Sequence, residues 1–194
     1  MDLEALLRIT VVLLPLVVTP GPANLANFAI GCAGNVKRGL AFTAGLNLAV
    51  LIWSLVFFFG GSALVSQPWF PLLGLQIAGV LYIAYLGYSL LRSPAVSAAD
   101  NLDNIPGFQG GFVLQMLNPK LFVLLLVVLS QIPVMSVGWM SLFILYFILL
   151  NLLPHVGYLL LGLWGASLGS LQFRNRLSGV LLILVAGWIS LELL

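Results

Sequence analysis

The amino-acid sequence predicts an all-α integral membrane protein, in which a single domain of residues 1–194 holds six transmembrane helices as a three-plus-three inverted repeat. Three observations predict this class: the composition, the long uncharged runs, and a pattern that the two halves of the chain share. Of the 194 residues, 62% are hydrophobic and 6% are charged, whereas soluble domains carry about 25% charged residues. A water-soluble globule, a disordered chain and a nucleic-acid-binding protein are therefore excluded.

The uncharged runs predict where the helices lie. A spanning helix needs roughly 20 apolar residues, and residues 39–91 contain no charged side chain. This run is long enough for two spans with a turn at residues 66–71. Residues 121–173 are also uncharged, and they hold the end of one span, a turn near residues 131–138 and another full span. The predicted helices are residues 3–33, 39–65, 70–92, 109–132, 138–168 and 176–194.

The first predicted helix is expected to stay in the protein. Asp2 and Glu4 stand where a cleavable signal would carry basic residues, and no small-residue cleavage site follows the apolar run. The chain has one cysteine, Cys32, so it forms no internal disulfide. One cysteine with one histidine does not make a zinc site. We expect no metal and no other cofactor.

The basic residues predict how the chain crosses the membrane. In a chain of six spans, the first, third and fifth loops lie on the same side of the membrane. These three loops hold the basic residues Lys37, Arg38, Arg92, Arg174 and Arg176. Loops rich in lysine and arginine stay in the cytoplasm. Both termini, together with Arg8, are then expected on the opposite side of the membrane.

The two halves of the chain, residues 1–92 and 108–194, are joined by a polar loop at 93–107 and share a pattern. Gly79 and Gly87 recur one hundred positions later as Gly179 and Gly187. Three spans in each half reverse the orientation of the second half, which makes an inverted repeat. The alternative is a chance match between spans that are rich in leucine and glycine. The corresponding polar and proline positions are Asn47 with Asn151 and Pro20 with Pro119.

Two proline-containing segments interrupt the predicted helices at matching places. Thr19-Pro20-Gly21-Pro22 lies inside the first helix, and Asn118-Pro119-Lys120 lies inside the fourth. Proline removes a backbone hydrogen bond inside a helix, and in hydrocarbon the freed groups must face protein or a water-filled cavity. Such interruptions in both halves indicate a transport site. The N–H groups after the first segment suit a carboxylate, and the carbonyls before each proline suit an ammonium; a kinked packing helix is the alternative.

Two titratable residues lie within the predicted spans. Lys120 is about 16 Å along the fourth helix, near the bilayer centre, where a charge costs at least about 2.5 kcal/mol. It is a candidate for binding a carboxylate or for releasing a proton; the alternative is a lysine that caps the carbonyls exposed by Pro119 or reaches an interface. His155 is a candidate proton carrier, because imidazole titrates near neutral pH. A neutral histidine bonded to a carbonyl that Pro154 frees is an equal alternative.

Other polar residues in the spans are expected mainly to bond one helix to another. Asn24 is the exception, because it lies two residues after the first interruption and is a candidate for contact with a substrate. The residues expected to join helices are Asn27, Asn47 and Gln115, and the secondary polar candidates for the site are Asn47 and Asn151.

A segment at residues 165–169 reads Gly-Ala-Ser-Leu-Gly and matches the nucleophile pattern of hydrolases. It ends a membrane helix instead of joining a strand to a helix, and no acid is placed to orient His155. We therefore expect no enzyme. Gly165 and Gly169 instead suit a close helix contact, which makes a homodimer possible.

These motifs together resemble the LysE/RhtB superfamily of amino-acid exporters. The resemblance rests on TPGP at residues 19–22, on YLGYSLLRS at residues 85–93 and on NPK at residues 118–120, and it covers nearly the whole chain. The chain length is close to that of the cysteine and O-acetylserine exporter branch. The chain departs from the family at Ala23, where many members have Asn or Asp. The motif residues fall on Pro20, Gly21, Pro22, Asn118, Pro119 and Lys120.

The resemblance implies a bacterial inner-membrane exporter of amino acids or small derivatives that draws on the proton motive force. The mechanism we expect is alternating access, in which the two halves rock about a central site. The substrate carboxylate would meet Lys120 and the N–H groups after Pro22, and its ammonium would meet the freed carbonyls with Asn24 or Asn118.

The charges of the spans predict the class of substrate. Apart from terminal residues, the predicted spans hold no Asp or Glu, so a dibasic substrate would leave a buried charge unpaired. Neutral amino acids are therefore expected. A passive channel for small neutral solutes and a membrane scaffold without transport are the competing functions.

Overall fold

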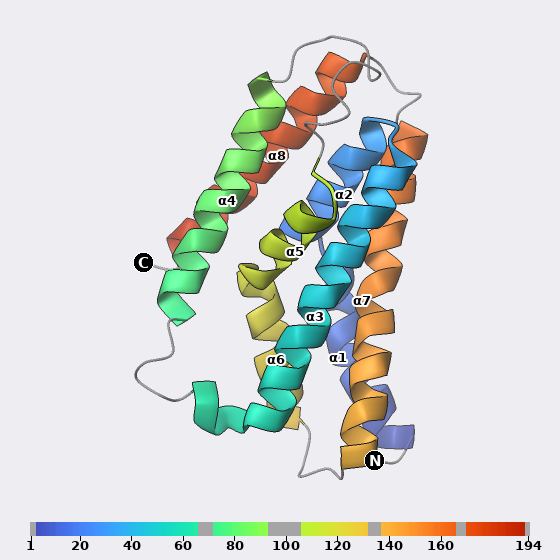
Figure 1. The fold of residues 1–194 in the computed structure, drawn as a ribbon, viewed down its shortest axis with the longest axis vertical. Coiled ribbons are helices and arrows are strands. Elements are labelled where there is room, and N and C mark those ends of the chain that lie inside the picture. Colours follow the sequence, from blue (N-terminus) through green and yellow to red (C-terminus); the bar gives the residue numbers. More distant parts are fainter. Residues whose placement is uncertain (1–2, 66–71, 93–105, 132–136, 166–169, 193–194) are drawn as a thin grey trace.

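The structure is a computed structural model that describes residues 3–65, 72–92, 106–131, 137–165 and 170–192. Every regular element in these ranges is an α-helix (Figure 1). The predicted turn at 66–71, most of the loop 93–107, most of the turn near 131–138 and residues 166–169 lie outside the described residues. The helices are α1 (Leu3–Val18), α2 (Pro22–Cys32), α3 (Val36–Val65), α4 (Leu72–Arg92), α5 (Phe108–Met116), α6 (Pro119–Gln131), α7 (Val137–Gly165) and α8 (Leu171–Glu192).

The first and fourth predicted helices are each divided in two. α1 ends at Val18 and α2 begins at Pro22, with a bend of 47° between their axes. α5 ends at Met116, and α6 begins at Pro119. Both second halves begin at a proline, because the missing N–H is not needed at the first position of a helix. The interruptions therefore have a local cause that can be read from the sequence.

Length and composition support fewer spans than the six that the sequence predicts. Within the described residues, Val36–Gly60 and Val137–Gly165 are long and apolar enough to cross a membrane, and the bent pair α1 and α2 adds a third span if it is counted as one. The apolar parts of α4 and α8 are shorter, at Val80–Arg92 and Arg176–Gly187. The three-plus-three arrangement therefore stays a prediction.

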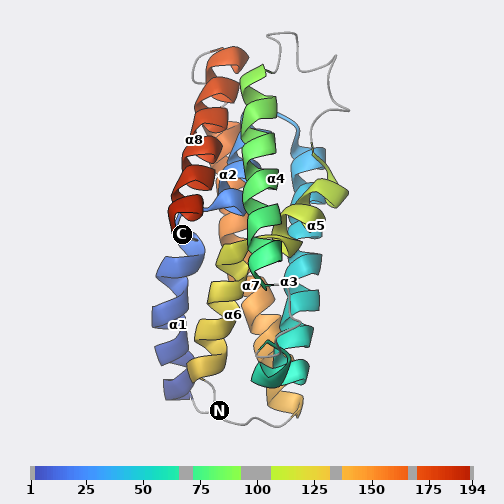
Figure 2. The same ribbon diagram turned by 90° about the vertical axis from the view of Figure 1, so that its left-hand side faces the viewer.

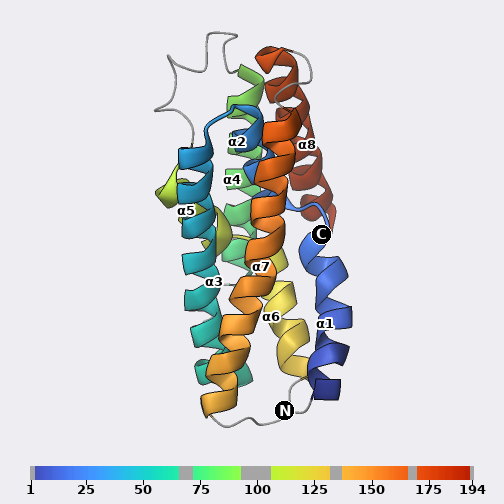
Figure 3. The ribbon, with the colours of Figure 1, turned by 90° about the vertical axis from the view of Figure 1, so that its right-hand side faces the viewer.

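The long helices α3 and α7 form the axis of the molecule. They lie side by side along most of its length (Figure 3). Helices α2, α4, α5 and α8 pack around one half of this axis, and α1 and α6 pack around the other (Figures 1 and 2). We call these the upper half and the lower half, as Figure 1 draws them. The first residues of α3 and the last residues of α4 lie at the upper end.

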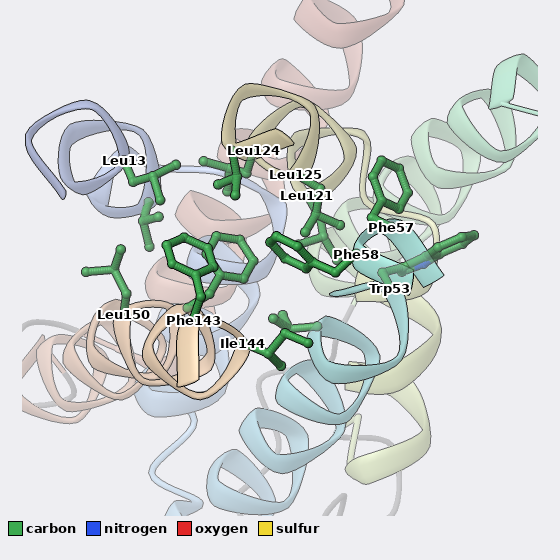
Figure 4. Packing of buried hydrophobic residues seen from close by; sticks show 14 of the residues in the cluster. Leu13, Trp53, Phe57, Phe58, Leu121, Leu124, Leu125, Phe143, Ile144 and Leu150 are labelled. Carbon is green, nitrogen blue, oxygen red and sulfur yellow. The ribbon is translucent and has the colours of Figure 1, made fainter. Parts of the chain in front are cut away.

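Each half has its own apolar core. In the lower half, side chains of α1, α3, α6 and α7 pack together, and Leu13, Leu124 and Phe143 gather between these helices (Figure 4). The core of the upper half contains Leu46 of α3 and Leu159 of α7. Along α7, the lower core ends at Leu150 and the upper core is reached only at Leu159. A polar layer occupies the interval.

The helices of the upper half approach one another closely at glycines. A Cβ atom on Gly31 of α2 would fall on the Leu159 carbonyl of α7, and one on Gly162 of α7 would fall on the Phe28 carbonyl of α2. The same reciprocal contact joins Gly45 of α3 to α5 and Gly111 of α5 to α3. Small residues of this kind let the backbones of membrane helices touch.

A third close contact joins α4 to α8. It involves two of the glycines on which the predicted inverted repeat rests. A Cβ on Gly87 would lie 2.9 Å from the Gly179 carbonyl oxygen, and a Cβ on Gly179 would lie 2.7 Å from the Gly87 carbonyl oxygen. The repeat matches Gly87 with Gly187, yet a Cβ on Gly187 would meet open space. The two matched glycines therefore have different surroundings in this structure. The close glycine contacts hold together the upper half.

Candidate functional site

A cavity lies in the polar layer between the two cores. Its volume is about 20 Å³, enough for roughly one water molecule and far less than the 300 Å³ or more of a typical ligand pocket. Both helix interruptions and α7 contribute to its lining. Lys120 is the one side chain with a formal charge among the described lining residues. The polar lining residues are Asn24, Gln115, Asn118, Lys120, Asn151 and His155.

The carbonyl groups that end α1 are held by side chains from other segments. Asn24 Nδ2 donates to the Val17 carbonyl at 3.1 Å and to the Thr19 carbonyl at 3.2 Å. The Tyr158 hydroxyl donates to the Val18 carbonyl at 3.1 Å. Lys120 Nζ donates to the Thr19 carbonyl oxygen at 2.6 Å. The carbonyls of Val17, Val18 and Thr19 therefore each have a side-chain donor, as an apolar surrounding requires.

The second interruption is held mainly by neutral groups. The Met116 carbonyl accepts from Trp53 Nε1 at 3.1 Å. Asn118 Oδ1 accepts the backbone N–H of Lys120 at 3.1 Å, which is the bond that a capping residue makes at the start of a helix. Asn118 Nδ2 donates to Gln115 Oε1 at 2.8 Å. Both ends of the Asn118 amide are thus engaged in holding α6 onto α5.

A buried polar chain leads from the cavity into the upper half. His155 Nδ1 lies 3.4 Å from Asn47 Nδ2, which also donates to the Thr43 carbonyl at 2.8 Å. The Thr43 hydroxyl donates to Asn27 Oδ1 at 3.0 Å. Within the described residues, Asn27 Nδ2 and Asn47 Oδ1 have no hydrogen-bond partner. These contacts join α2, α3 and α7 and connect the imidazole of His155 to Asn47.

The structure brings most of the predicted site residues together. Gly21, Asn24, Asn118, Lys120, Asn151 and His155 line the cavity. Pro22 and Pro119 are buried beside them, whereas Pro20 is exposed. Asn47 reaches the cavity through His155. Within the described ranges, no three His, Cys, Asp or Glu side chains are grouped as metal ligands.

Two side chains that hold the interruptions were not singled out from the sequence. Tyr158 acts on α1 from 140 positions away along the chain, and Trp53 acts on α5 from 63 positions away. Tyr158 lies one helical turn after the buried His155 and therefore on the same side of α7. That spacing is the only signal in the sequence that points to it.

Gly21 gives the Lys120 side chain room to reach the end of α1. A Cβ at position 21 would lie 3.0 Å from Lys120 Cδ and 3.2 Å from Lys120 Nζ. We expect the methyl group of Gly21→Ala to crowd the Lys120 side chain where it lines the cavity and to lower the rate of solute transport by roughly threefold to tenfold, which corresponds to about 0.7–1.4 kcal/mol. The fold should persist. The measurement is transport per molecule of monodisperse purified protein. An unchanged rate would show that the Lys120 side chain can avoid the added methyl group without loss of function.

The model of the LysE type translocator family matches residues 14–189, which include both interruptions and every described residue of the cavity lining. This match confirms the resemblance to the LysE/RhtB superfamily. No curated protein and no solved structure matches the chain. The chain therefore belongs to the LysE type translocator family, a family of membrane transporters for amino acids or similar solutes.

Proposed function

We propose that this protein exports neutral amino acids, or small derivatives of them, across the bacterial inner membrane. The observation that carries the proposal is the convergence of both interrupted helices on one cavity, whose lining holds one ammonium and, in the described part of the chain, no carboxylate. An α-amino acid carries an ammonium and a carboxylate. Carbonyl oxygens accept hydrogen bonds from the ammonium, and a lysine pairs with the carboxylate.

The charges at the site favour a substrate without a net charge. The substrate carboxylate pairs with Lys120 and approaches the first turn of α2, where Ala23 and Asn24 line the cavity. The substrate ammonium bonds to the carbonyls that end α1. A second ammonium, on a lysine or arginine substrate, finds no acidic partner among the lining residues and stays unpaired in a poorly solvated place.

Alternating access is supported by the difference between the two halves. The upper half is closed by three glycine contacts, and the cavity of about 20 Å³ has no room for an amino acid. A substrate can enter only if helices separate. Lys37, Arg38 and Arg92 lie at the ends of α3 and α4 in the upper half, so the positive-inside rule favours a cytoplasmic side for this half. With six spans, both termini would then be periplasmic. The three-plus-three repeat provides the opposite state.

Proton coupling is assigned to the two titratable groups that line the cavity, Lys120 and His155. Lys120 meets the substrate directly. His155 contacts Asn47 and lines the same cavity, so a proton on its ring would change the charge that the substrate meets. Each group can thereby couple the occupancy of the site to the proton gradient.

The proposal predicts a preference that transport assays measure. In vesicles that contain the purified protein, alanine or leucine should exchange at least about tenfold faster than lysine, since an unpaired charge costs more than 1.4 kcal/mol. A proton gradient should drive accumulation, and a protonophore should abolish it. Faster exchange of lysine would contradict the substrate class. Equilibration without accumulation under a proton gradient would indicate the passive channel instead.

A further inference from the structure

The ammonium of Lys120 already occupies a place that suits the ammonium of a substrate. It does not point freely into the cavity: Nζ donates to the Thr19 carbonyl oxygen at 2.6 Å. This carbonyl stands at the C-terminal end of α1, where the helix dipole favours a positive charge. Asn24 supplies a second, neutral donor to the same oxygen at 3.2 Å.

We propose that the Thr19 carbonyl is the ammonium subsite for an α-amino acid and that Lys120 occupies it as an internal substitute while the site is empty. The inference rests on the proposed function and extends it to the exchange of contacts at the site. A lysine side chain and an α-amino acid both present a primary ammonium with three N–H donors. They can therefore bind the same carbonyl in turn, but not together.

The exchange requires a ligand with two charged ends. When the substrate ammonium takes the Thr19 carbonyl, Lys120 loses its acceptor and needs a new one, and the substrate carboxylate provides it. A simple amine would displace Lys120 without giving it a partner, which leaves two cations in one small site. A simple carboxylate would draw Lys120 away and leave the Thr19 carbonyl with Asn24 alone. The site is thus selective for zwitterions over amines and acids.

The same exchange links binding to movement of the helices. Lys120 belongs to α6 and Thr19 ends α1, and the two residues are 101 positions apart in the chain. Their bond therefore fastens the two interruptions to each other beside the cavity. Because the cavity is too small for an amino acid, α1 and α6 must separate when a substrate enters. The substrate ammonium then binds the Thr19 carbonyl, and the substrate carboxylate binds the Lys120 ammonium, so both groups regain a partner.

A single-lysine protein tests this directly. The chain has two lysines, Lys37 and Lys120, so a Lys37→Arg variant that carries ζ-¹⁵N-lysine gives one side-chain NMR signal, which comes from Lys120. We expect alanine and leucine to shift this signal at concentrations at least tenfold lower than ethylamine, propionate, isopentylamine or 4-methylpentanoate. An amine or an acid that shifts the signal as well as the amino acid would overturn the inference.

A gain of binding provides the second test. In a Lys120→Met variant the Thr19 carbonyl is no longer occupied by an ammonium, so ethylamine and isopentylamine should raise the thermal stability of the purified protein at concentrations at least tenfold lower than in the wild type. Unchanged affinity for amines would count against the subsite. If alanine or leucine is transported but never shifts the Lys120 signal, only this inference fails. If neither is transported nor shifts the signal, the proposed function fails with it.

Discussion

Replacement of Lys120 by methionine should lower the export of a neutral amino acid roughly 10- to 100-fold. Methionine keeps the length of the side chain and removes its ammonium. The loss is that of a hydrogen bond to a charged group, about 1.5–3 kcal/mol, at a cavity whose lining has no other formal charge in the described residues. The rate is measured by counterflow of radiolabelled alanine or leucine in vesicles that contain equal amounts of protein.

Lys37→Met is the matched control for this prediction. Lys37 is the other lysine of the chain, and it is exposed in the first turn of α3. The same substitution there should leave the rate within about twofold, because surface charges contribute little. Export by Lys120→Met at the wild-type rate, with Lys37→Met as reference, would remove Lys120 from the mechanism. A loss of monodisperse protein in Lys120→Met alone would show that the lysine mainly holds α1 and α6 together.

The places where the helices are interrupted can be predicted from the sequence, because their cause is local. A proline inside a helix lacks the donor that the preceding turn needs, and two such segments stand at residues 19–22 and 118–120. Apolar runs likewise predict the all-helical class. The polar residues within those runs predict most of the cavity lining, since polar groups in apolar spans gather where they can satisfy one another.

The partners of the freed carbonyls cannot be read from the sequence. The alternative role for Lys120 that the sequence suggests is to cap the carbonyls that Pro119 exposes, whereas the structure places its ammonium on Thr19 of the other interruption. Tyr158 and Trp53 hold carbonyls that are far from them along the chain. Such pairs depend on which helices become neighbours, and helical periodicity reports only on residues within one helix.

The glycine contacts also show that the sequence does not predict which helices become neighbours. The predicted repeat includes Gly87 and Gly179 and matches each with a glycine in the other half, whereas the structure places these two against each other. A sequence repeat matches corresponding positions in the two halves of the chain. It does not state which of those positions meet in a given conformation, and an alternating-access protein has more than one.

Gly162→Ala should destabilise the upper half of the molecule by about 1–3 kcal/mol, the usual cost of inserting a methyl group into a tight contact. The new Cβ would fall on the Phe28 carbonyl and 2.9 Å from the Cys32 nitrogen, both in the backbone of α2. Backbone atoms cannot turn aside as a flexible side chain can, so α2 and α7 must move apart. A fall in the thermal midpoint of purified protein, with faster proteolysis, measures the effect.

Gly157→Ala provides the comparison within the same helix. A Cβ at Gly157 would meet nothing within 4 Å, and alanine is favoured over glycine in a helix by about 0.5–1 kcal/mol. The two substitutions add the same atom to α7, yet the midpoint should fall for Gly162→Ala and stay level or rise for Gly157→Ala. Equal midpoints would show that α2 and α7 do not touch at Gly162 in the membrane. The closed upper half, on which alternating access depends here, would then lose one of its three close glycine contacts.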